Sequence, residues 1–281
     1  MYTVTSDAPI VDLHVQSTPQ TLTIVRGMLS GVAEQLAMDP ELLDDLKTSV
    51  SEACNNVVLH AYEGEAGPMD VRVFVEEEGI RVSVEDRGVG LPEPPPAIED
   101  GSGGLGVSVM QALARDVRLI SRRGGGTEVL MRFDGRRDDR PLFTAPVAAT
   151  VHDGPAPEND DPVDEVTVTV SPVALLSPVL GRVARTLAAT AHFSLDRFSD
   201  VYLITDALAA HADQASVGDR VTATLRASRR RLALALGPFR RGTGRMLERR
   251  VPSPLSMLVD EVTVSERGDG DIVELVVLDR R

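Results

Sequence analysis

The sequence contains no tryptophan, one cysteine and one lysine among its 281 residues. The single cysteine, Cys54, cannot form a disulfide within the chain, so the cysteine pattern gives no indication of an oxidising compartment. The single lysine, Lys47, does not follow the glycine pattern of a P-loop, which excludes that kind of phosphate-binding site. Aromatic residues make up only 3% of the chain, so its cores must be built from aliphatic side chains.

Basic side chains are outnumbered as well. The chain has 29 Lys and Arg residues against 43 Asp and Glu residues, which gives a formal net charge of −14. Nucleic acids and anionic membranes are bound by clustered positive charge, so we expect neither direct nucleic-acid binding nor membrane attachment. The N-terminus lacks the pattern of a signal peptide, and no run of about 20 apolar residues predicts a membrane-spanning helix. These features favour a cytoplasmic protein.

The hydropathy pattern predicts two domains and a linker. A segment rich in Pro, Gly and charge, residues 134–165, is typical of a solvated connector. On each side of it the same order of elements is expected: strand, helix, helix, hairpin, glycine-bearing loop, short helix and hairpin. We therefore predict α+β domains over residues 1–133 and 166–281, related by tandem duplication. Two unrelated α+β domains are the alternative.

The first motif lies on a predicted helix that begins at Pro40, with Asp39 as its N-cap. Glu52, Asn56 and His60 follow at intervals of four residues, which places them on one stripe of that helix beside its apolar face. An amide oxygen suits a hard cation and a carboxylate suits a base, so the stripe is a candidate site. The alternative is a partly solvated helix face, and for His60 a structural role is the more common one.

The second motif follows an apolar strand. Residues 85–90, EDRGVG, place the carboxylate of Asp86 at the strand end, and Gly88 and Gly90 follow it. A carboxylate there can accept a hydrogen bond from an exocyclic amine, and glycines allow a flat ring or a phosphate to approach the backbone. A plain strand-to-turn exit would have the same pattern.

The third motif is the glycine-rich segment of residues 101–106, GSGGLG, which opens a helix predicted over residues 107–114. Free N–H groups at a helix N-terminus attract anions, so this segment is a candidate phosphate-binding loop or a flexible lid. A dinucleotide-binding fingerprint is disfavoured because no parallel βαβ unit surrounds the segment.

Taken together, in this order and at these separations, the three motifs resemble the N, G1 and G2 boxes of the GHKL, or Bergerat-fold, ATPases. Within that superfamily, ExxxNxxxHAY followed by DxGxG, a short lid and GGLG looks like the anti-sigma-factor serine kinases. The resemblance covers residues 10–133. It implies a two-layer α/β sandwich of the Bergerat type, with ATP and Mg²⁺ as cofactors.

The resemblance implies a role for each matching position. Asn56 would ligate Mg²⁺, and Glu52 would be the general base that takes the proton from a target Ser or Thr hydroxyl. Asp86 would bind the adenine amino group. The remaining nucleotide-binding positions would be Gly88, Gly90, Gly104, Leu105, Gly106 and Thr127.

One departure from the family pattern concerns the lid, residues 91–102, which holds four prolines and no Lys or Arg to meet the γ-phosphate. Arg87 lies near the site in the sequence, although its side chain could equally be solvated. This departure puts the rate of phosphoryl transfer in doubt more than ATP binding.

The second copy resembles the same fold without its chemistry. Two registers are possible: Glu52 corresponds to Asp206 or Ala207, and Asn56 to Ala210 or His211. No Asp follows the strand that ends near residue 236, and residues 242–244 are a poor match for GGLG. We therefore expect a partner-binding domain without nucleotide, and either a homodimer or an intramolecular pseudo-dimer.

The functional expectation is an Mg-ATP-dependent serine/threonine kinase that sequesters a sigma factor and phosphorylates an anti-sigma-factor antagonist. A non-catalytic ATP-binding switch is the main alternative. The ATPase half of a sensor histidine kinase is disfavoured because no His-bearing helix pair precedes residue 10. A mechanical ATPase would need middle domains for which this length leaves no room.

Overall fold

The computed structural model describes residues 8–91, 104–122, 124–135, 164–244, 254–268 and 270–280. The chain forms two compact units, Met1–Val147 and Ala148–Arg281, and each is described here by itself. The boundary between them falls inside the segment predicted as a linker. Residues 136–163 of that linker and residues 92–102 of the expected lid lie outside the described residues, as does residue 103.

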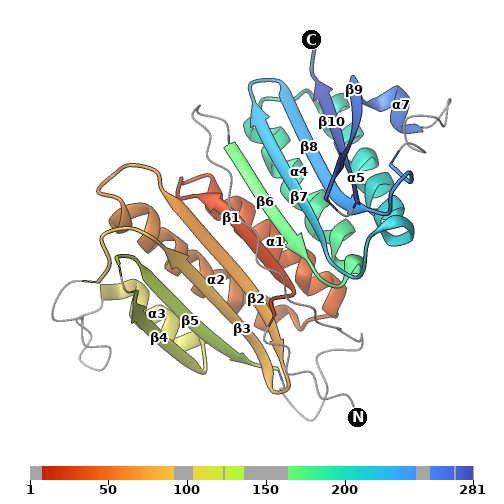
Figure 1. Cartoon of the computed structure of the whole chain (residues 1–281). Coiled ribbons are helices and arrows are strands. Elements are labelled where there is room, and N and C mark those ends of the chain that lie inside the picture. The colour runs from red at the N-terminus through yellow and green to blue at the C-terminus, as the bar shows by residue number, and fades with distance from the viewer. Residues whose placement is uncertain are drawn as a thin grey trace. The chain divides into compact units, whose positions relative to one another are not determined.

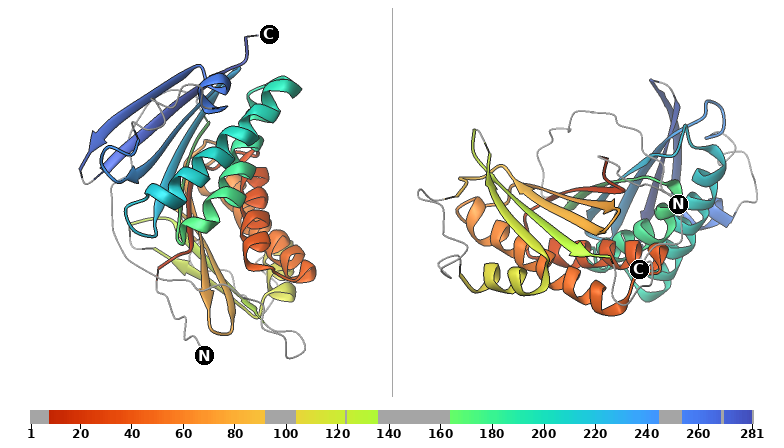
Figure 2. Two further views of the ribbon diagram at one scale, coloured as in Figure 1. Left: turned by 90° about the vertical axis from the view of Figure 1, so that its right-hand side faces the viewer. Right: turned by 90° about the horizontal axis from the view of Figure 1, so that it is seen from below.

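Unit 1 is a five-stranded antiparallel sheet with helices on one face (Figure 1 and Figure 2). The strand order is β4-β5-β3-β2-β1, and every neighbouring pair is antiparallel. In chain order the elements are β1 (Val11–Gln16), α1 (Thr21–Leu36), α2 (Pro40–Asn56), the π-helical turn η1 (Val57–Ala61), β2 (Pro68–Glu76), β3 (Gly79–Asp86), α3 (Gly104–Leu113), β4 (Asp116–Ser121) and β5 (Thr127–Asp134).

The alternation of side chains along the strands divides this sheet into two faces. The helix-facing side is aliphatic, and in β2 it consists of the buried side chains of Met69, Val71, Val73 and Val75. The opposite face carries charged side chains, as the period of two along a strand requires. Asp39 caps α2 as expected, because its carboxylate accepts a hydrogen bond from the N–H of Glu41 at 2.9 Å. The α+β, two-layer architecture expected from the sequence is confirmed.

Unit 2 is also a five-stranded antiparallel sheet, with the strand order β6-β7-β8-β10-β9. Among the described residues its element order and strand order repeat those of unit 1. The shared topology is what a duplication requires, but it does not establish common descent, so the duplication stays a prediction. The elements are β6 (Asp164–Val170), η2 (Val173–Leu175), α4 (Leu176–Thr190), α5 (Leu195–Ala215), β7 (Val221–Ser228), β8 (Arg231–Phe239), α7 (Pro254–Leu258), β9 (Glu261–Arg267) and β10 (Gly270–Leu278).

The burial patterns of α2 and α5 decide which positions correspond in the two units. The spacing of the buried residues is the same in both helices, and it pairs Glu52 with Ala207 and Asn56 with His211. The π-helical turn η1 adds one residue to unit 1 after this point. The matching buried residues are Leu46, Ser49, Val50, Ala53 and Cys54 in α2, and Val201, Ile204, Thr205, Leu208 and Ala209 in α5.

One stretch of unit 2 is more apolar than the sequence analysis expects. Residues Val173–Thr190 have a mean hydropathy of 1.2, which by length and composition would allow them to span a membrane. The stretch is 56% buried within the structure, and Val179, Val183 and Leu187 are fully buried. The core helix of a water-soluble domain has the same properties, so this stretch is weak support for a membrane span.

Candidate functional site

Asp86 is the last residue of β3, and it faces the helices together with Val82 and Val84. The residue is only 5% exposed. Its carboxylate accepts hydrogen bonds from the N–H of Gly88, at 2.8 Å, and from the backbone N–H of Thr127. Burial raises the pKa of Asp86, and the two hydrogen bonds offset part of that rise. Two donors do not saturate a carboxylate, which offers about four lone-pair directions.

Thr127 begins β5 and lies beside Asp86 because of the strand register. Glu85 of β3 pairs with Glu128 of β5, and Val84 pairs with Val129. Thr127 is therefore the residue next to Asp86 across the sheet, and it shares the helix-facing side with Val129. The family resemblance implies that these two residues belong to one site although they are far apart in the sequence, and the register brings them together.

The turn after β3 packs against the end of the helix and against the last hairpin. The N–H of Val89 donates to the carbonyl oxygen of Ala61 at 2.9 Å. A Cβ on Gly88 would collide with that same carbonyl group, and a Cβ on Gly126 would collide with the carbonyl oxygen of Asp86. Gly90 has a φ of +80° and lies against Gly126. The backbone in this turn is therefore closely approached on two sides, and only glycine fits there.

Glu52 and Asn56 lie near the C-terminal end of α2 and face the first turn of α3. A Cβ built on Gly106 would be 2.9 Å from Glu52 Oε2 and 3.6 Å from Asn56 Oδ1. The packing of α3 on α2 thus brings the third motif against the first. The sequence predicts that this helix begins at residue 107, but it begins at Gly104. Gly104, Leu105 and Gly106 therefore form its first turn. The Leu105 side chain lies outside the described part of the structure.

His60 does not continue the stripe of Glu52 and Asn56. The α-helix ends at Asn56, and His60 lies in the π-helical turn η1, where its side chain is exposed. A π-helical turn has more residues per turn than an α-helix, so a spacing of four residues no longer keeps a side chain on the same face.

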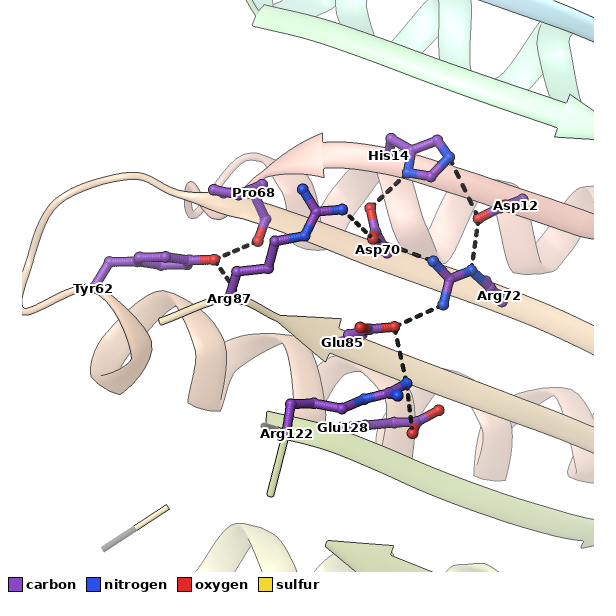
Figure 3. Close-up of polar contacts among 10 residues, drawn as sticks. All are labelled: Asp12, His14, Tyr62, Pro68, Asp70, Arg72, Glu85, Arg87, Arg122 and Glu128. Atoms are coloured by element: carbon purple, nitrogen blue, oxygen red, sulfur yellow. Dashed lines mark hydrogen bonds and ion pairs between the residues drawn. The ribbon is translucent and has the colours of Figure 1, made fainter. Parts of the chain in front are cut away.

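Tyr62 is a site residue that the sequence analysis leaves without a role. Its hydroxyl donates to the carbonyl oxygen of Pro68 at 2.5 Å and accepts from the N–H of Arg87 at 2.8 Å (Figure 3). Its ring lies against the backbone of Gly67, where a Cβ would not fit. Tyr62 therefore connects the end of the helix to the turn after Asp86. The sequence feature that could have indicated this role is the position of Tyr62, two residues after His60.

The Arg87 side chain points to the sheet face opposite Asp86. Its Nη2 lies 3.4 Å from Asp70 Oδ2, within an ion-pair network on that face (Figure 3). Arg72 is the centre of the network and bonds to Asp12, Asp70 and Glu85. The basic side chain expected near the site therefore faces away from it. The other members of the network are His14, Arg122 and Glu128.

Comparison with known proteins agrees with this geometry. Residues 15–133 match the family model described as a histidine kinase-like ATPase domain. The chain is 32% identical over 147 residues to the serine-protein kinase RsbW of Bacillus subtilis, a match that covers 92% of that protein and 48% of this chain. The chain belongs to the histidine kinase-like ATPase family. Within it the relatives place the protein in the branch of the anti-sigma-factor serine kinases.

Two further relatives of this ATPase family member were found. It is 32% identical over 136 residues to the anti-sigma F factor of Caldanaerobacter subterraneus subsp. tengcongensis, covering 95% of that protein and 45% of this chain. A solved structure of the RsbU and RsbW domains of Rv1364c from Mycobacterium tuberculosis is similar with a TM-score of 0.35 and 23% identity. That match covers 45% of this chain and 33% of the other. Family membership confirms the resemblance, while the role of each site residue stays a prediction.

Proposed function

We propose that the protein is an Mg-ATP-dependent serine/threonine kinase that phosphorylates an anti-sigma-factor antagonist and sequesters a sigma factor. The observation that carries the proposal is the approach of Gly106 to Glu52 and Asn56. It puts a carboxylate, an amide oxygen and a glycine-rich helix start at one place. Phosphoryl transfer needs these parts: a proton acceptor, a group for the metal and a cradle for phosphates.

The adenine base fits the Asp86 end of the site. The carboxylate of Asp86 has acceptor capacity left after its two backbone hydrogen bonds, so it can accept the N–H of the adenine amino group. Gly88 and Gly90 let the turn after β3 pack closely on Ala61 and Gly126, next to the carboxylate, and Thr127 stands beside the carboxylate to support the base. A buried acceptor distinguishes an amine from a carbonyl strongly, because a mispaired buried group costs about 1–3 kcal/mol.

The side chains of Glu52 and Asn56 suit a metal ion that binds together with the nucleotide. Among the described residues no group of three His, Cys, Asp or Glu side chains could hold a metal by itself. Mg²⁺ commonly keeps several waters and is bound through substrate phosphates and few protein groups. Asn56 would hold it through the amide oxygen, and when bound it would neutralise charge on the phosphates. Glu52 would take the proton from the attacking hydroxyl, while Gly104, Leu105 and Gly106 would wrap the phosphates.

A non-catalytic switch is the second candidate, and one observation favours it. Arg87 faces away from the site, and the sequence of residues 91–102 holds no Lys or Arg. In this alternative nucleotide binding sets partner affinity and no phosphate is transferred. The retention of Glu52 in contact range of Gly106 favours the kinase.

The partners and the assembly are also part of the proposal. The relatives named as RsbW and anti-sigma F factor support a sigma factor and an antagonist as partners. We propose a cytoplasmic protein that does not contact nucleic acid directly, and either a homodimer or an intramolecular pseudo-dimer of the two units. Sedimentation of the full chain separates these two, since a concentration-independent monomer mass excludes the homodimer.

The deciding experiment is affinity capture of partners from cell extract in the presence of ATP, followed by a phosphotransfer assay with each purified partner. The expected result is one phosphorylated Ser or Thr on a captured protein. Glu52→Gln should abolish transfer while ATP still binds, and Glu65→Gln, at an exposed carboxylate beyond the helix, should transfer normally. ATP binding without any phosphoprotein would support the switch, and wild-type transfer by Glu52→Gln would contradict the assigned base.

A further inference from the structure

Helix α5 of unit 2 has large apolar side chains on the side opposite its buried residues. Leu195 is 86% exposed, Tyr202 51% and Leu203 52%. They are seven and eight residues apart, which is about two helical turns, so the three side chains lie on one face. Ile204 and Leu208, which α5 buries within the unit, lie on the other face. We call the exposed side the outer face of α5.

The corresponding helix of unit 1 has a polar outer face at the same positions. The register of buried residues in α2 and α5 pairs Lys47 with Tyr202, and Thr48 with Leu203. Of the exposed large hydrophobic side chains in the described part of unit 1, none lies on α2. A single exposed apolar residue is common on protein surfaces and needs no explanation. Here, however, the same topology occurs with a polar face in one unit, so the fold does not require the apolar face of the other.

Helix α4 lies beside α5 (Figure 2) and holds the ring of Tyr202 in place. The guanidinium carbon of Arg185 is 5.6 Å from the centroid of that ring, within the range of a cation–π interaction. The Nε of Arg185 also donates to the carbonyl oxygen of Gly181 at 3.1 Å, which keeps the guanidinium in this position. A ring that is already held loses little conformational entropy when a partner covers it, and tyrosine is enriched among the residues that dominate binding.

Acidic side chains continue the outer face toward the C-terminal end of α5. Asp206 and Asp213 follow Tyr202 by four and eleven residues, which keeps them on the same stripe, and both are exposed. Within the described residues neither belongs to an ion pair. The one arginine of α5, Arg197, bonds to Asp260 Oδ2 at 2.6 Å and is not available to them. The outer face is therefore apolar in its first half and negatively charged in its second half.

We propose that the outer face of α5 is the docking surface for an amphipathic, basic helix of a partner protein. The apolar stripe of that helix packs on Leu195, Tyr202 and Leu203, and its Lys or Arg side chains pair with Asp206 and Asp213. This surface lies on unit 2, so it is separate from the ATP site proposed in unit 1.

Spacing favours a helix as the bound segment, and charge favours a basic one. The small exposed residues Ser199 and Ala210 alternate with larger ones along α5, which leaves grooves for the side-chain ridges of a second helix. From Leu195 to Asp213 the face extends about 27 Å, the length of a helix of about 18 residues. A second copy of the chain fits less well, because its α5 would bring four aspartates and a single arginine that is already bound.

The test uses the full chain and a designed peptide of about 18 residues with leucines on one helical face and lysines on the other. Binding is measured by fluorescence anisotropy without nucleotide, so the result does not depend on the ATP site. The matched probes are a peptide with Glu in place of Lys, and a peptide of the same composition in shuffled order. We expect saturable binding of the Leu/Lys peptide, and binding at least about 10-fold weaker for both matched probes.

Three results with these peptides would overturn the proposal. Equal binding of the shuffled peptide would mean that charge attraction alone acts, without an apolar face. Equal binding of the Leu/Glu peptide would contradict the basic character of the partner. Absence of saturable binding of the Leu/Lys peptide would mean that the outer face does not accept a helix.

Variants locate the bound peptide on α5. The double variant Tyr202→Ser, Leu203→Thr removes the apolar side chains without a change of net charge, and it should bind the Leu/Lys peptide at least about 10-fold more weakly. The double variant Asp206→Asn, Asp213→Asn should weaken binding at least about 3-fold and make it less sensitive to salt. The matched control is Ile120→Thr, at an exposed apolar residue of unit 1, which should bind as the wild type does.

Folding and self-association are controlled separately. If the first double variant does not fold by circular dichroism, Leu203→Thr alone decides, since Thr48 occupies that place in unit 1. Wild-type affinity in a folded variant of the apolar residues would overturn the proposal. A dimer that sedimentation detects in the wild type but not in this variant would also overturn it, because a second copy would then be the occupant.

Discussion

Gly106→Ala tests the contact on which the proposed catalytic site depends. The new methyl group would be 2.9 Å from Glu52 Oε2, whereas carbon and oxygen atoms in proteins rarely approach closer than about 3.3 Å. The carboxylate must therefore move by about 0.4 Å or more, since the backbone of α3 is the stiffer of the two. The distances to the Asn56 side chain, 3.6 and 3.7 Å, are ordinary contacts, so Asn56 can stay in place.

The expected effects on stability and on rate have opposite signs. Gly106 is the third residue of α3, and replacing a helical glycine with alanine stabilises a helix by roughly 0.5–1 kcal/mol. A displacement of about 1 Å at a catalytic group can reduce a rate about 100-fold, so a shift of about half that should reduce kcat about 10-fold. A 10-fold decrease corresponds to about 1.4 kcal/mol of lost transition-state stabilisation.

The assay is single-turnover phosphotransfer to the antagonist at saturating ATP, together with nucleotide affinity and urea unfolding followed by circular dichroism. The matched control is Gly181→Ala, also in a helix, where the new Cβ would be 3.5 Å from Thr205 Oγ1, an ordinary contact. That variant should transfer at the wild-type rate. A folded Gly106→Ala protein with wild-type kcat would refute the reasoning, because Glu52 would then not act from the observed position.

Three further predictions follow from individual side chains. Tyr62→Phe removes the hydroxyl that accepts from the N–H of Arg87, so we expect unfolding to become easier by about 1 kcal/mol and ATP to bind more weakly; unchanged urea and ATP titrations would contradict this. Burial raises the pKa of Asp86 above 3.8, so its ionisation destabilises the fold as pH rises. Asp86→Asn should therefore need more urea to unfold than wild type at pH 7, and this gain in stability should shrink toward pH 4. The variant should also bind ATP more weakly. The hydrogen bond that the His14 ring donates to the Asp70 carboxylate raises the pKa of His14 above 6.5. The pair therefore stabilises the fold at lower pH, and this contribution is lost as pH rises through the raised value; His14→Gln should lack this pH dependence.

The elements and the family could be predicted from the sequence because their signals are local. Asp39 and Pro40 mark a helix start through backbone chemistry that acts within four residues. The strands of unit 1 follow from alternation, because a buried face imposes a period of two. The start of α3 was placed too late because glycine has low helix propensity, and the packing of Gly106 on α2 overrides that propensity.

The orientation of side chains at element ends could not be predicted. Asp86 and Arg87 are neighbours in the sequence, and the sequence leaves open whether the Arg87 side chain reaches the site or the solvent. Since the strand continues through Asp86, Arg87 points to the opposite face and joins the network of Asp70. The role of Tyr62 could not be predicted because its partners are Pro68, at the start of β2, and Arg87, just after β3. Their proximity depends on the register of the sheet.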